Sequence, residues 1–391
     1  MSGGGLEPHL AGGRLTIDLS ALAENYRFLA ARSAPAEAAA VVKADAYGIG
    51  IRPAARALWT AGCRRFFVAL PHEGVALREA VPDSEIFVLN GLFGTEAAAV
   101  HREARLIPVL GSQSDLSIWE AHGWDSEDPR PCVIHVDTGM NRLGLTYERA
   151  RALVEENALT GALTPILVMS HLACAGTPDD PMNARQLSGF QAVRMLFPGV
   201  PASLCNSAGI FLGGDFLCDL TRPGIALYGG AAADGPNPMK PVVTAETRVA
   251  QVRYARAGET VSYAATPLMR DTIIAVASTG YADGYHRSAS SAAVPLRKLG
   301  QPGASGFLHG REVPLLGRVT MDLTMFDVTD LGADAVAVGD HIELFGPNMP
   351  IDRMADAAGT ISYEVLTSLG QRYHREYIEA DAKSGQDRSK R

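Results

Sequence analysis

The sequence is poor in cysteine, and the pattern of its cysteines excludes several classes of protein. Five cysteines occur, an odd number, and no two of them form a CxxC pair. This pattern excludes a disulfide framework, and we predict reduced thiols in a cytoplasmic protein. His171 and Cys174 lie three residues apart, but a metal site needs a second pair of ligands. We therefore predict no metal centre.

Two further absences disfavour membrane-spanning and exported proteins. No run of about 18 apolar residues is present that could cross a bilayer. The first residues, MSGGGLEPHLAGG, lack a charged region followed by an apolar one. We therefore interpret residues 1–12 as a disordered tail and not as a signal peptide. We expect a second disordered tail at residues 381–391.

Basic residues are also in deficit. Lysine and arginine together number 35 against 43 aspartates and glutamates, which gives a net charge of -8. A negative protein repels nucleic-acid phosphates and anionic membrane surfaces. The short C-terminal stretch KSGQDRSKR is basic, but it is small. We predict that neither nucleic acid nor a membrane is a partner.

What is present is a regular alternation of apolar segments and helical stretches. The chain has 391 residues, and single cores stop growing at roughly 250 to 300 residues, so we expect two domains. We interpret eight apolar segments as strands: 41–44, 66–70, 86–90, 106–110, 133–137, 167–171, 204–208 and 225–229. This pattern predicts a closed α/β barrel of eight parallel strands over residues 13–240. An open doubly wound sheet is the alternative, but no GxGxxG turn follows the first strand.

The composition changes after this region. The stretch GGAAADGPNPMKP is rich in glycine and proline, which is typical of a linker. Short alternating strands with turns follow it, including TAETRVAQVRYARAGETVSYA and REVPLLGRVTMDLTMFDVTD. A last helical segment, MADAAGTISYEVLTSLGQRYHREY, ends the folded part. We predict a mainly β domain over residues 241–380.

Polar residues recur where the predicted barrel strands end. Active sites of such barrels lie at the carboxyl ends of the strands. His171 there could also be a core residue satisfied by the backbone, and the Ser207 hydroxyl could bind a phosphate. The pattern indicates a site on this face, formed by residues at or just after apolar segments: Lys43, Asp137, His171, Ser207 and Tyr228.

The stretch AAVVKADAYGIG, residues 39–50, holds the most informative of these residues. Lys43 closes an apolar strand, and a lysine in that position either reaches solvent or is used chemically. Tyr47 and the glycines beside it offer a phenol and bare amides to an anion. A lysine beside a phosphate-sized site suggests a Schiff base to pyridoxal 5'-phosphate.

This stretch resembles the cofactor-lysine motif of the alanine racemase family, a pyridoxal phosphate family of fold type III. Further motifs follow in the family's order between residues 13 and 376: HVDTGMNRLG, TRPGIALYGG, VSYAATP, GYADGYHR and GRVTMD. Within residues 39–50, two positions depart from the family pattern, since Asp45 replaces Asn and Ile49 replaces a frequent His. The resemblance implies that Lys43 holds the cofactor and that Tyr47 binds it, as do His171 and Ser207.

The resemblance also assigns roles to later barrel residues. Arg142 would contact the cofactor's phenolic oxygen and the substrate carboxylate, Arg222 the pyridine nitrogen, and the backbone of Gly224 and Ile225 the phosphate. Many family members carry a carbamylated lysine, which orients the arginine, where this chain has His135. Our hypothesis is that a neighbouring side chain or a bound anion replaces the carbamate.

In the second domain the resemblance implies the second catalytic base. Tyr263 matches a family tyrosine that is contributed across the subunit interface, although Ala264 replaces the usual Gly after it. Tyr281, Met321 and Asp322 match residues near the substrate. Without the resemblance, each of these residues is explained equally well by packing. The resemblance therefore implies a homodimer with shared active sites.

Three further details bear on this site. A phenol is a poor base at neutral pH unless cations stabilise its anion, and we expect His171 and Arg222 to do so. Arg287 and Arg318 would line the substrate entrance. Gln371 stands where some members have a tyrosine on the phosphate, and this change would widen the inner gate.

Taken together, the resemblance implies an alanine racemase in which Lys43 and Tyr263 exchange the Cα proton of alanine. The rivals are a broad-specificity amino-acid racemase, a barrel decarboxylase and a non-catalytic pyridoxal phosphate-binding protein. The decarboxylase is disfavoured because its ring nitrogen should face a carboxylate, whereas this chain offers Arg222. The sequence leaves open the substrate range and whether D-alanine serves cell-wall synthesis or catabolism.

Overall fold

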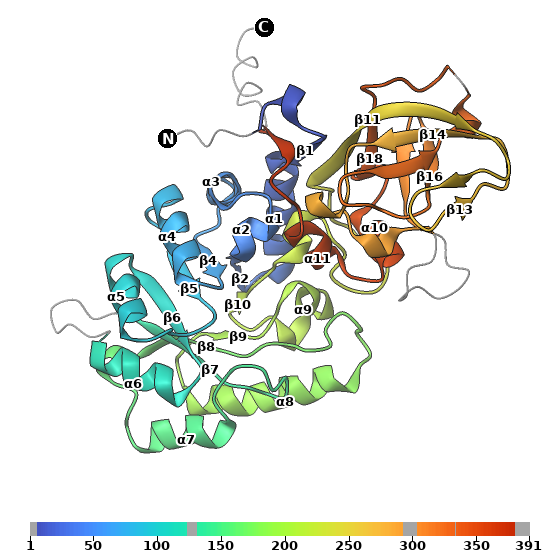
Figure 1. Ribbon diagram of the computed structural model, residues 1–391. Helices are drawn as coiled ribbons and strands as arrows, with labels where there is room; N and C mark the ends of the chain where they lie inside the picture. Colours follow the sequence, from blue (N-terminus) through green and yellow to red (C-terminus); the bar gives the residue numbers. More distant parts are fainter. Residues whose placement is uncertain (1–5, 123–130, 292–302, 333, 380–391) are drawn as a thin grey trace, which may run out of the picture. The chain divides into compact units, whose positions relative to one another are not determined.

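The computed structural model describes residues 6–122, 131–291, 303–332 and 334–379. It divides into two compact units (Figure 1). The first unit is Leu22–Lys240, and the second combines Met1–Ala21 with Pro241–Arg391. Each unit has its own sheet and core, and each is described by itself below.

The first unit is built on a parallel sheet of seven strands in sequence order. These strands are β3 (Ala40–Val41), β4 (Arg65–Val68), β5 (Glu85–Val88), β6 (Leu106–Leu110), β7 (Cys132–His135), β8 (Pro165–Met169) and β9 (Ala202–Ser203). Strands β6 and β7 are buried along their whole length. Continuous burial is expected for parallel strands, because helices cover one face and the barrel interior covers the other.

An eighth strand closes the barrel. Strand β10 (Leu220–Thr221) pairs in parallel with β2 (Glu37–Ala38). The Asp219 amide donates to the Ala202 carbonyl at 3.0 Å on one side, and the Val41 amide donates to the Pro223 carbonyl at 2.9 Å on the other. The α/β barrel of eight parallel strands predicted from the sequence is therefore confirmed.

The positions of the last two predicted strands were wrong. Of the predicted strand 225–229, residues 225–228 form a 3-10 helix, η4 (Ile225–Tyr228), and the eighth strand is β10 instead. Residues 204–208 follow strand β9 and lead into helix α9 (Ser207–Leu212). Both segments are apolar because they are buried, and burial alone does not distinguish a strand from a short helix.

Helices lie along the outside of the barrel strands (Figure 1). A core that includes the fully buried side chains of Trp119, Phe190 and Ile134 fills the space between helices and strands. The helices are α1 (Leu19–Ser33), α2 (Lys43–Tyr47), α3 (Ile51–Thr60), α4 (Pro71–Ala80), α5 (Thr95–Glu103), α6 (Gln113–His122), α7 (Tyr147–Glu155), α8 (Pro181–Leu196) and α9.

The second unit is a closed antiparallel barrel with two added strands. Strands β14 (Thr272–Ala277), β17 (Thr324–Asp327), β16 (Arg311–Leu316), β15 (Ser305–Leu308) and β18 (His341–Phe345) follow one another in the sheet. Strand β11 (Val243–Ala255) pairs with both β18 and β14 and so closes the ring. A further hairpin consists of β12 (Thr260–Val261) and β13 (Thr266–Pro267). The mainly β character predicted from the sequence is confirmed.

The chain's two ends meet in this second unit. Strand β1 (Gly13–Asp18) pairs with β11 and, in parallel, with β19 (Tyr373–Ile378). Residues 13–21, which the sequence analysis assigned to the barrel, therefore belong to the second unit. The predicted final helix also needs correction, since helices α10 (Ile351–Ala358) and α11 (Ser362–Thr367) are followed by β19.

Part of the predicted N-terminal tail has regular structure. Residues Pro8–Leu10 form a 3-10 helix, and His374 Nδ1 lies 2.7 Å from the Leu6 carbonyl oxygen. Residues 1–5 of that tail, and the predicted tail at residues 381–391, lie outside the described residues. The prediction of a disordered tail was therefore wrong for residues 8–10.

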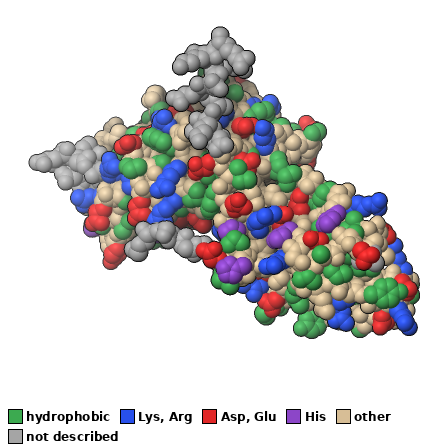
Figure 2. Space-filling view, turned by 90° about the horizontal axis from the view of Figure 1, so that it is seen from above, with side chains coloured by type: hydrophobic (Ala, Val, Ile, Leu, Met, Phe, Trp, Pro, Cys, Tyr) green, Lys and Arg blue, Asp and Glu red, His purple; other side chains and the backbone are tan. Residues whose placement is uncertain are grey.

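The described surface carries charges of both signs. Figure 2 shows Lys and Arg side chains interspersed with Asp and Glu side chains on the face drawn. Many of them form exposed ion pairs, such as Arg353 with Glu312 at 2.7 Å. Exposed pairs of this kind contribute about 0 to 1 kcal/mol each. Among the described helices, none is long and apolar enough to span a membrane.

Candidate functional site

Lys43 lies where strand β3 ends and an unusual turn begins. The next four residues, Ala44 to Tyr47, all have φ between 52° and 54°, so α2 is a left-handed turn. Left-handed backbone costs roughly 1 to 2 kcal/mol per residue with a side chain. Gly48, with φ of 84°, ends the turn without that cost. The turn is therefore strained and needs support from its surroundings.

Glu73 on helix α4 supplies part of this support. Its Oε1 accepts a hydrogen bond from the Ala44 amide at 2.7 Å. Its Oε2 accepts from the Ala69 and Leu70 amides at 2.8 and 3.0 Å. The carboxylate, which is 9% exposed, thus ties the residue after Lys43 to the end of strand β4. The sequence analysis missed Glu73, although Pro71 and Glu73 at the start of a helix are a capping signal.

The surroundings of Lys43 favour its neutral amine. Burial lowers the pKa of Lys43, and the positive charge of Arg142 lowers it further. The Glu73 carboxylate acts in the opposite direction but does not offset these two effects. A neutral amine is the form that attacks a carbonyl carbon or accepts a proton.

Tyr47 and Tyr228 stack beside Lys43. Their ring centroids are 4.5 Å apart, and the Tyr228 hydroxyl donates to the Val41 carbonyl at 2.9 Å. A Cβ atom on Gly224 would lie 2.2 Å from the Tyr47 hydroxyl oxygen. Gly224 is therefore needed for this close approach, which brings a phenol hydroxyl against bare backbone.

An oxygen-binding cradle lies at the same place. The Ser207 hydroxyl oxygen accepts hydrogen bonds from the Gly224 amide at 2.7 Å and from the Ala226 amide at 3.3 Å. Ile225, between them, is fully buried at the start of η4. The two amides hold the Ser207 oxygen, and the Ser207 hydroxyl hydrogen and the nearby Tyr47 phenol are donors of the kind that a phosphate group requires. The residues present therefore fit the phosphate of pyridoxal phosphate.

Arg222, which is buried, and His171, which is half-buried, bring two nitrogen groups together. Arg222 is 3% exposed and donates to the Ser203 hydroxyl, to the Ser170 carbonyl at 2.6 Å and to the Leu204 carbonyl at 3.4 Å. Its Nη2 lies 3.3 Å from His171 Nδ1. Burial lowers the pKa of Arg222 to about 10, so the guanidinium is still charged at neutral pH. It can therefore donate to a ring nitrogen that lacks a proton.

His171 is neutral in these surroundings. Burial and then the charges of Arg222 and Arg142 lower the pKa of His171 well below its ordinary value. The expectation that His171 acts as a cation is therefore wrong, because the arginines beside it disfavour a second positive charge. Its Nε2 lies 3.5 Å from the Asn206 amide nitrogen, and Asn206 also caps helix α9.

The loop before Arg142 is fixed, but its guanidinium is not. Asp137 accepts hydrogen bonds from the amides of Gly139, Met140 and Asn141 at 2.9 to 3.2 Å. Arg142 itself is exposed, and no hydrogen bond or ion pair joins it to another described residue. The loop therefore places Arg142 without orienting its side chain.

His135 does not replace a carbamylated lysine electrostatically. It is 7% exposed, and burial together with Arg222 and Arg142 lowers its pKa to about 4. His135 is therefore neutral at physiological pH and brings no negative charge to Arg142. No neighbouring side chain among the described residues replaces the carbamate, and a bound anion stays a hypothesis.

Gln186 on helix α8 is a second residue that the sequence analysis missed. Its Nε2 donates to the His171 carbonyl at 2.8 Å, and its Oε1 accepts from the Ala173 amide at 2.8 Å. The side chain is fully buried. Gln186 therefore fixes the backbone of His171 and of Ala173, two residues further along the chain. A single glutamine in an amphipathic helix carries no sequence signal for this role.

In the second unit, Tyr263 lies in a turn and not in a strand. It follows β12, is 70% exposed and sits between residues of positive φ: Ser262 at 61° and Ala264 at 66°. The expectation of a strand position was wrong because the hairpin turns at this point. The left-handed conformation of Ala264 gives a physical reason for the glycine that is usual there.

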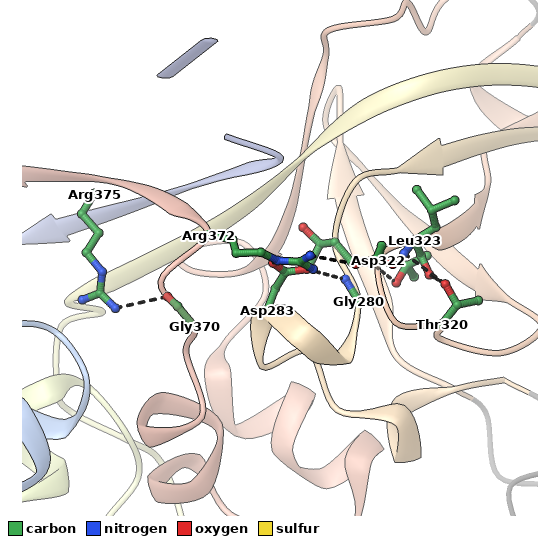
Figure 3. Close-up of polar contacts among 10 residues, drawn as sticks. Gly280, Asp283, Thr320, Asp322, Leu323, Gly370, Arg372 and Arg375 are labelled. Atoms are coloured by element: carbon green, nitrogen blue, oxygen red, sulfur yellow. Dashed lines mark hydrogen bonds and ion pairs between the residues drawn. The ribbon is translucent and has the colours of Figure 1, made fainter. Parts of the chain in front are cut away.

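The other second-unit residues lie on two adjoining loops (Figure 3). Tyr281, 43% exposed, belongs to the turn 280–284, and Met321, 53% exposed, to the loop 320–323 with Asp322. The Ala282 amide donates to the Met321 carbonyl at 3.1 Å. The structure thus brings Tyr281, Met321 and Asp322 together, and their place near the substrate stays a prediction. Arg287, Arg318 and Gln371 belong to the same unit.

Comparison with known proteins gives a consistent family. Residues 17–232 match the model of the alanine racemase N-terminal domain, and residues 242–377 match that of the C-terminal domain. The chain is 55% identical over 371 residues to an alanine racemase of Rhizobium meliloti, covering 94% of this chain and 97% of that protein. It is 53% identical to a biosynthetic alanine racemase of Agrobacterium fabrum, covering 94% of each.

A solved structure supports the same assignment. The crystal structure of an alanine racemase from Bartonella henselae, with covalently bound pyridoxal phosphate, is 38% identical with a TM-score of 0.86. It covers 94% of this chain and all of that chain. Family models, full-length relatives and fold therefore agree, and this chain belongs to the alanine racemase family.

Proposed function

We propose that this chain interconverts L-alanine and D-alanine with pyridoxal phosphate, and that Lys43 and Tyr263 move the Cα proton. The observation that carries the proposal is the half-buried Lys43 amine, whose lowered pKa favours its neutral form, within one barrel that also holds an oxygen cradle at Gly224 and a buried Arg222. Membership of the alanine racemase family makes the activity that of an alanine racemase.

The barrel residues would hold the cofactor. Lys43 would attach it covalently, while Tyr47, Ser207 and the amides of Gly224 and Ile225 would bind its phosphate. Arg222 would donate to the ring nitrogen, with His171 beside it. Pyridoxal phosphate, when bound, withdraws electrons from the substrate and so acidifies the Cα proton. An arginine partner leaves the ring a weaker electron sink than a carboxylate would, which disfavours side reactions.

The chain's own groups would perform the proton transfers. Inversion at Cα requires a base on each face, and the Lys43 amine, whose pKa is lowered, suits one face. Tyr263 would serve the other face from a second copy of the chain, since its exposure leaves it available to a partner. Arg142 would bind the substrate carboxylate, and Tyr281, Met321 and Asp322 would lie near the substrate. The proposal therefore includes a homodimer.

Two finer points belong to the same proposal. A cytoplasmic location fits the five free thiols. The product D-alanine would serve as a peptidoglycan precursor, in line with the biosynthetic name of the Agrobacterium relative.

The decisive experiment is conversion of L-alanine to D-alanine by purified holoenzyme, with L-serine, L-lysine and L-arginine in parallel. Conversion of alanine well above the others would support the proposal. Faster turnover of the basic amino acids would favour a broad-specificity racemase. Absence of turnover by protein that retains the visible absorbance of bound cofactor would favour the binding-protein alternative.

A further inference from the structure

Two loops of the second unit are joined backbone to backbone. The Tyr281 amide donates to the Thr320 carbonyl at 3.0 Å, and the Ala282 amide donates to the Met321 carbonyl at 3.1 Å. A Cβ atom on Gly280 would lie 2.2 Å from the Thr320 carbonyl oxygen. No side chain fits at this position, so the turn 280–284 and the loop 320–323 are in direct contact.

Arg372 bridges the carboxylates of the same two loops (Figure 3). Its Nε and Nη2 donate to the two oxygens of Asp283 at 2.6 and 2.8 Å, and its Nη1 donates to Asp322 Oδ1 at 2.7 Å. Asp283 is 5% exposed and also accepts from the Gly280 amide at 2.9 Å. One guanidinium therefore neutralises a buried carboxylate and holds a second, exposed one.

The backbone that carries Arg372 is itself fixed to the turn. The Gly370 amide donates to the Asp283 carbonyl at 3.0 Å. Gly284 adopts φ of 90°, and a Cβ atom there would lie 2.1 Å from the Ser368 carbonyl oxygen. The segment between α11 and β19 thus packs directly against the turn 280–284, which leaves the Arg372 fork little freedom.

Only arginine can make this bridge. Its planar guanidinium presents donors in a fixed fork, so it can bind one carboxylate with two hydrogen bonds and a second one with another. A lysine ammonium at the same position is a point charge without that geometry. The bonds to Asp283 also raise the pKa of Arg372, which keeps the bridge charged.

We propose that Arg372 is a positioning residue for the reaction. By bridging Asp283 and Asp322 it locks the Tyr281 turn to the loop of Met321 and Asp322, and so sets the binding of the amino-acid substrate. This inference rests on the proposed function, which gives those three residues their place near the substrate. Arg372 acts through the loops and does not itself touch the substrate.

The test is steady-state kinetics in both directions on the holoenzymes of Arg372→Met and Arg372→Lys. We expect KM for alanine to rise roughly tenfold or more in Arg372→Met, with a smaller change in kcat, because loosened loops weaken binding before chemistry. Arg372→Lys should restore KM only in part. The visible absorbance of bound pyridoxal phosphate should stay that of the wild type, since the barrel holds the cofactor.

Arg353→Met is the matched control. Arg353 forms a two-point ion pair with Glu312 at 2.7 and 3.0 Å in the same unit, but it touches neither loop. The Arg353→Met variant should have a KM for alanine within roughly twofold of that of the wild type. All rates are measured below the onset of thermal unfolding of each variant, so that a loss of stability does not mimic a loss of binding.

A double-mutant cycle with Asp322→Asn separates the bridge from general stability. Asp322→Asn keeps Asp283 paired, so it should fold even if Arg372→Met does not. Asp322→Asn should raise KM in the wild type and less so in the Arg372→Lys background. Equal effects in both backgrounds, or an unchanged KM in Arg372→Met, would overturn the inference. Absence of alanine racemisation by the wild type would instead overturn the proposed function.

Discussion

Most candidate site residues of the barrel are buried, whereas those of the second unit are exposed. In the barrel, Ser207, Arg222 and Tyr228 are each 2 or 3% exposed and are held by neighbours in the same barrel. In the second unit, Tyr263 and Met321 are 70 and 53% exposed. Burial tunes charge, as the lowered pKa values of Lys43, His135 and His171 show. Exposure leaves Tyr263 and Met321 free to meet a ligand or a second chain.

The same contrast runs through the strands. Strand β6 is buried at every residue, whereas β1 alternates between buried and half-buried positions and β11 becomes exposed toward its end. Parallel strands covered on both faces suit a preformed cofactor site. Antiparallel strands with one free face suit loops that extend outward. The barrel therefore suits the proposed cofactor site, and the loops of the second unit suit the proposed contribution of Tyr263 and Met321.

The largest expected effect separates the two units directly. Lys43→Ala should lower the rate of racemisation by roughly a thousandfold or more, and the visible absorbance of bound pyridoxal phosphate should be lost.

Tyr263→Phe should lower kcat by roughly a hundredfold or more, while the visible absorbance of the bound cofactor is kept. Absorbance spectra and racemisation rates on the same samples measure both. Loss of the cofactor in Tyr263→Phe, or full activity, would contradict the division of roles.

The support of the left-handed turn gives the next largest effect. In Glu73→Gln an amide group replaces one of the two oxygens that accept backbone hydrogen bonds, so we expect a loss of about 1 to 3 kcal/mol in stability. The rate should also fall, because the residue after Lys43 is no longer held. Glu79→Gln on the same helix, where Glu79 forms an exposed pair with Arg52, is the control. Similar unfolding midpoints and rates for the two variants would refute the role of Glu73.

A pH titration tests whether burial tunes the barrel. His135 has a folded pKa of about 4 against an ordinary value of 6.5. Above pH 6.5 both folded and unfolded chains hold it neutral, but between pH 6.5 and 4 only the unfolded chain gains the proton. Stability should therefore fall over this window by about 2 to 3 kcal/mol on account of His135. Urea unfolding of His135→Gln should show a correspondingly shallower fall, and parallel curves would exclude this cause.

The smallest effect concerns the exposed turn. Ala264 adopts φ of 66°, which disfavours a side chain, so Ala264→Gly should stabilise the protein by up to about 1 kcal/mol. Ala257→Gly, at an exposed position without positive φ, should destabilise it slightly instead. Thermal unfolding of both variants measures the difference. The same sign for both would mean that the turn is not strained.

The sequence indicated the candidate residues of its motifs more readily than the residues that support them. Lys43, Tyr47 and Arg222 were singled out because each lies in a motif with apolar or glycine neighbours, and their roles at the site stay predictions. Glu73 and Gln186 were missed because they hold backbone atoms that are distant in the chain, 29 residues away for Glu73 and Ala44 and 15 for Gln186 and His171. Arg372 was missed because the Asp283 carboxylate that it binds lies 89 residues away in the chain.

By itself, the sequence determined the fold class, the alternation of the barrel and the identity of the groups that can carry chemistry, because these depend on local patterns of apolar and polar residues. Only the tertiary structure decided that residues 225–228 are a helix, that Tyr263 lies in a turn and that β1 joins the second unit. It alone also decided that His171 is neutral. The reason is physical: strand pairing, burial and charge proximity depend on residues distant in the chain, which no local pattern specifies.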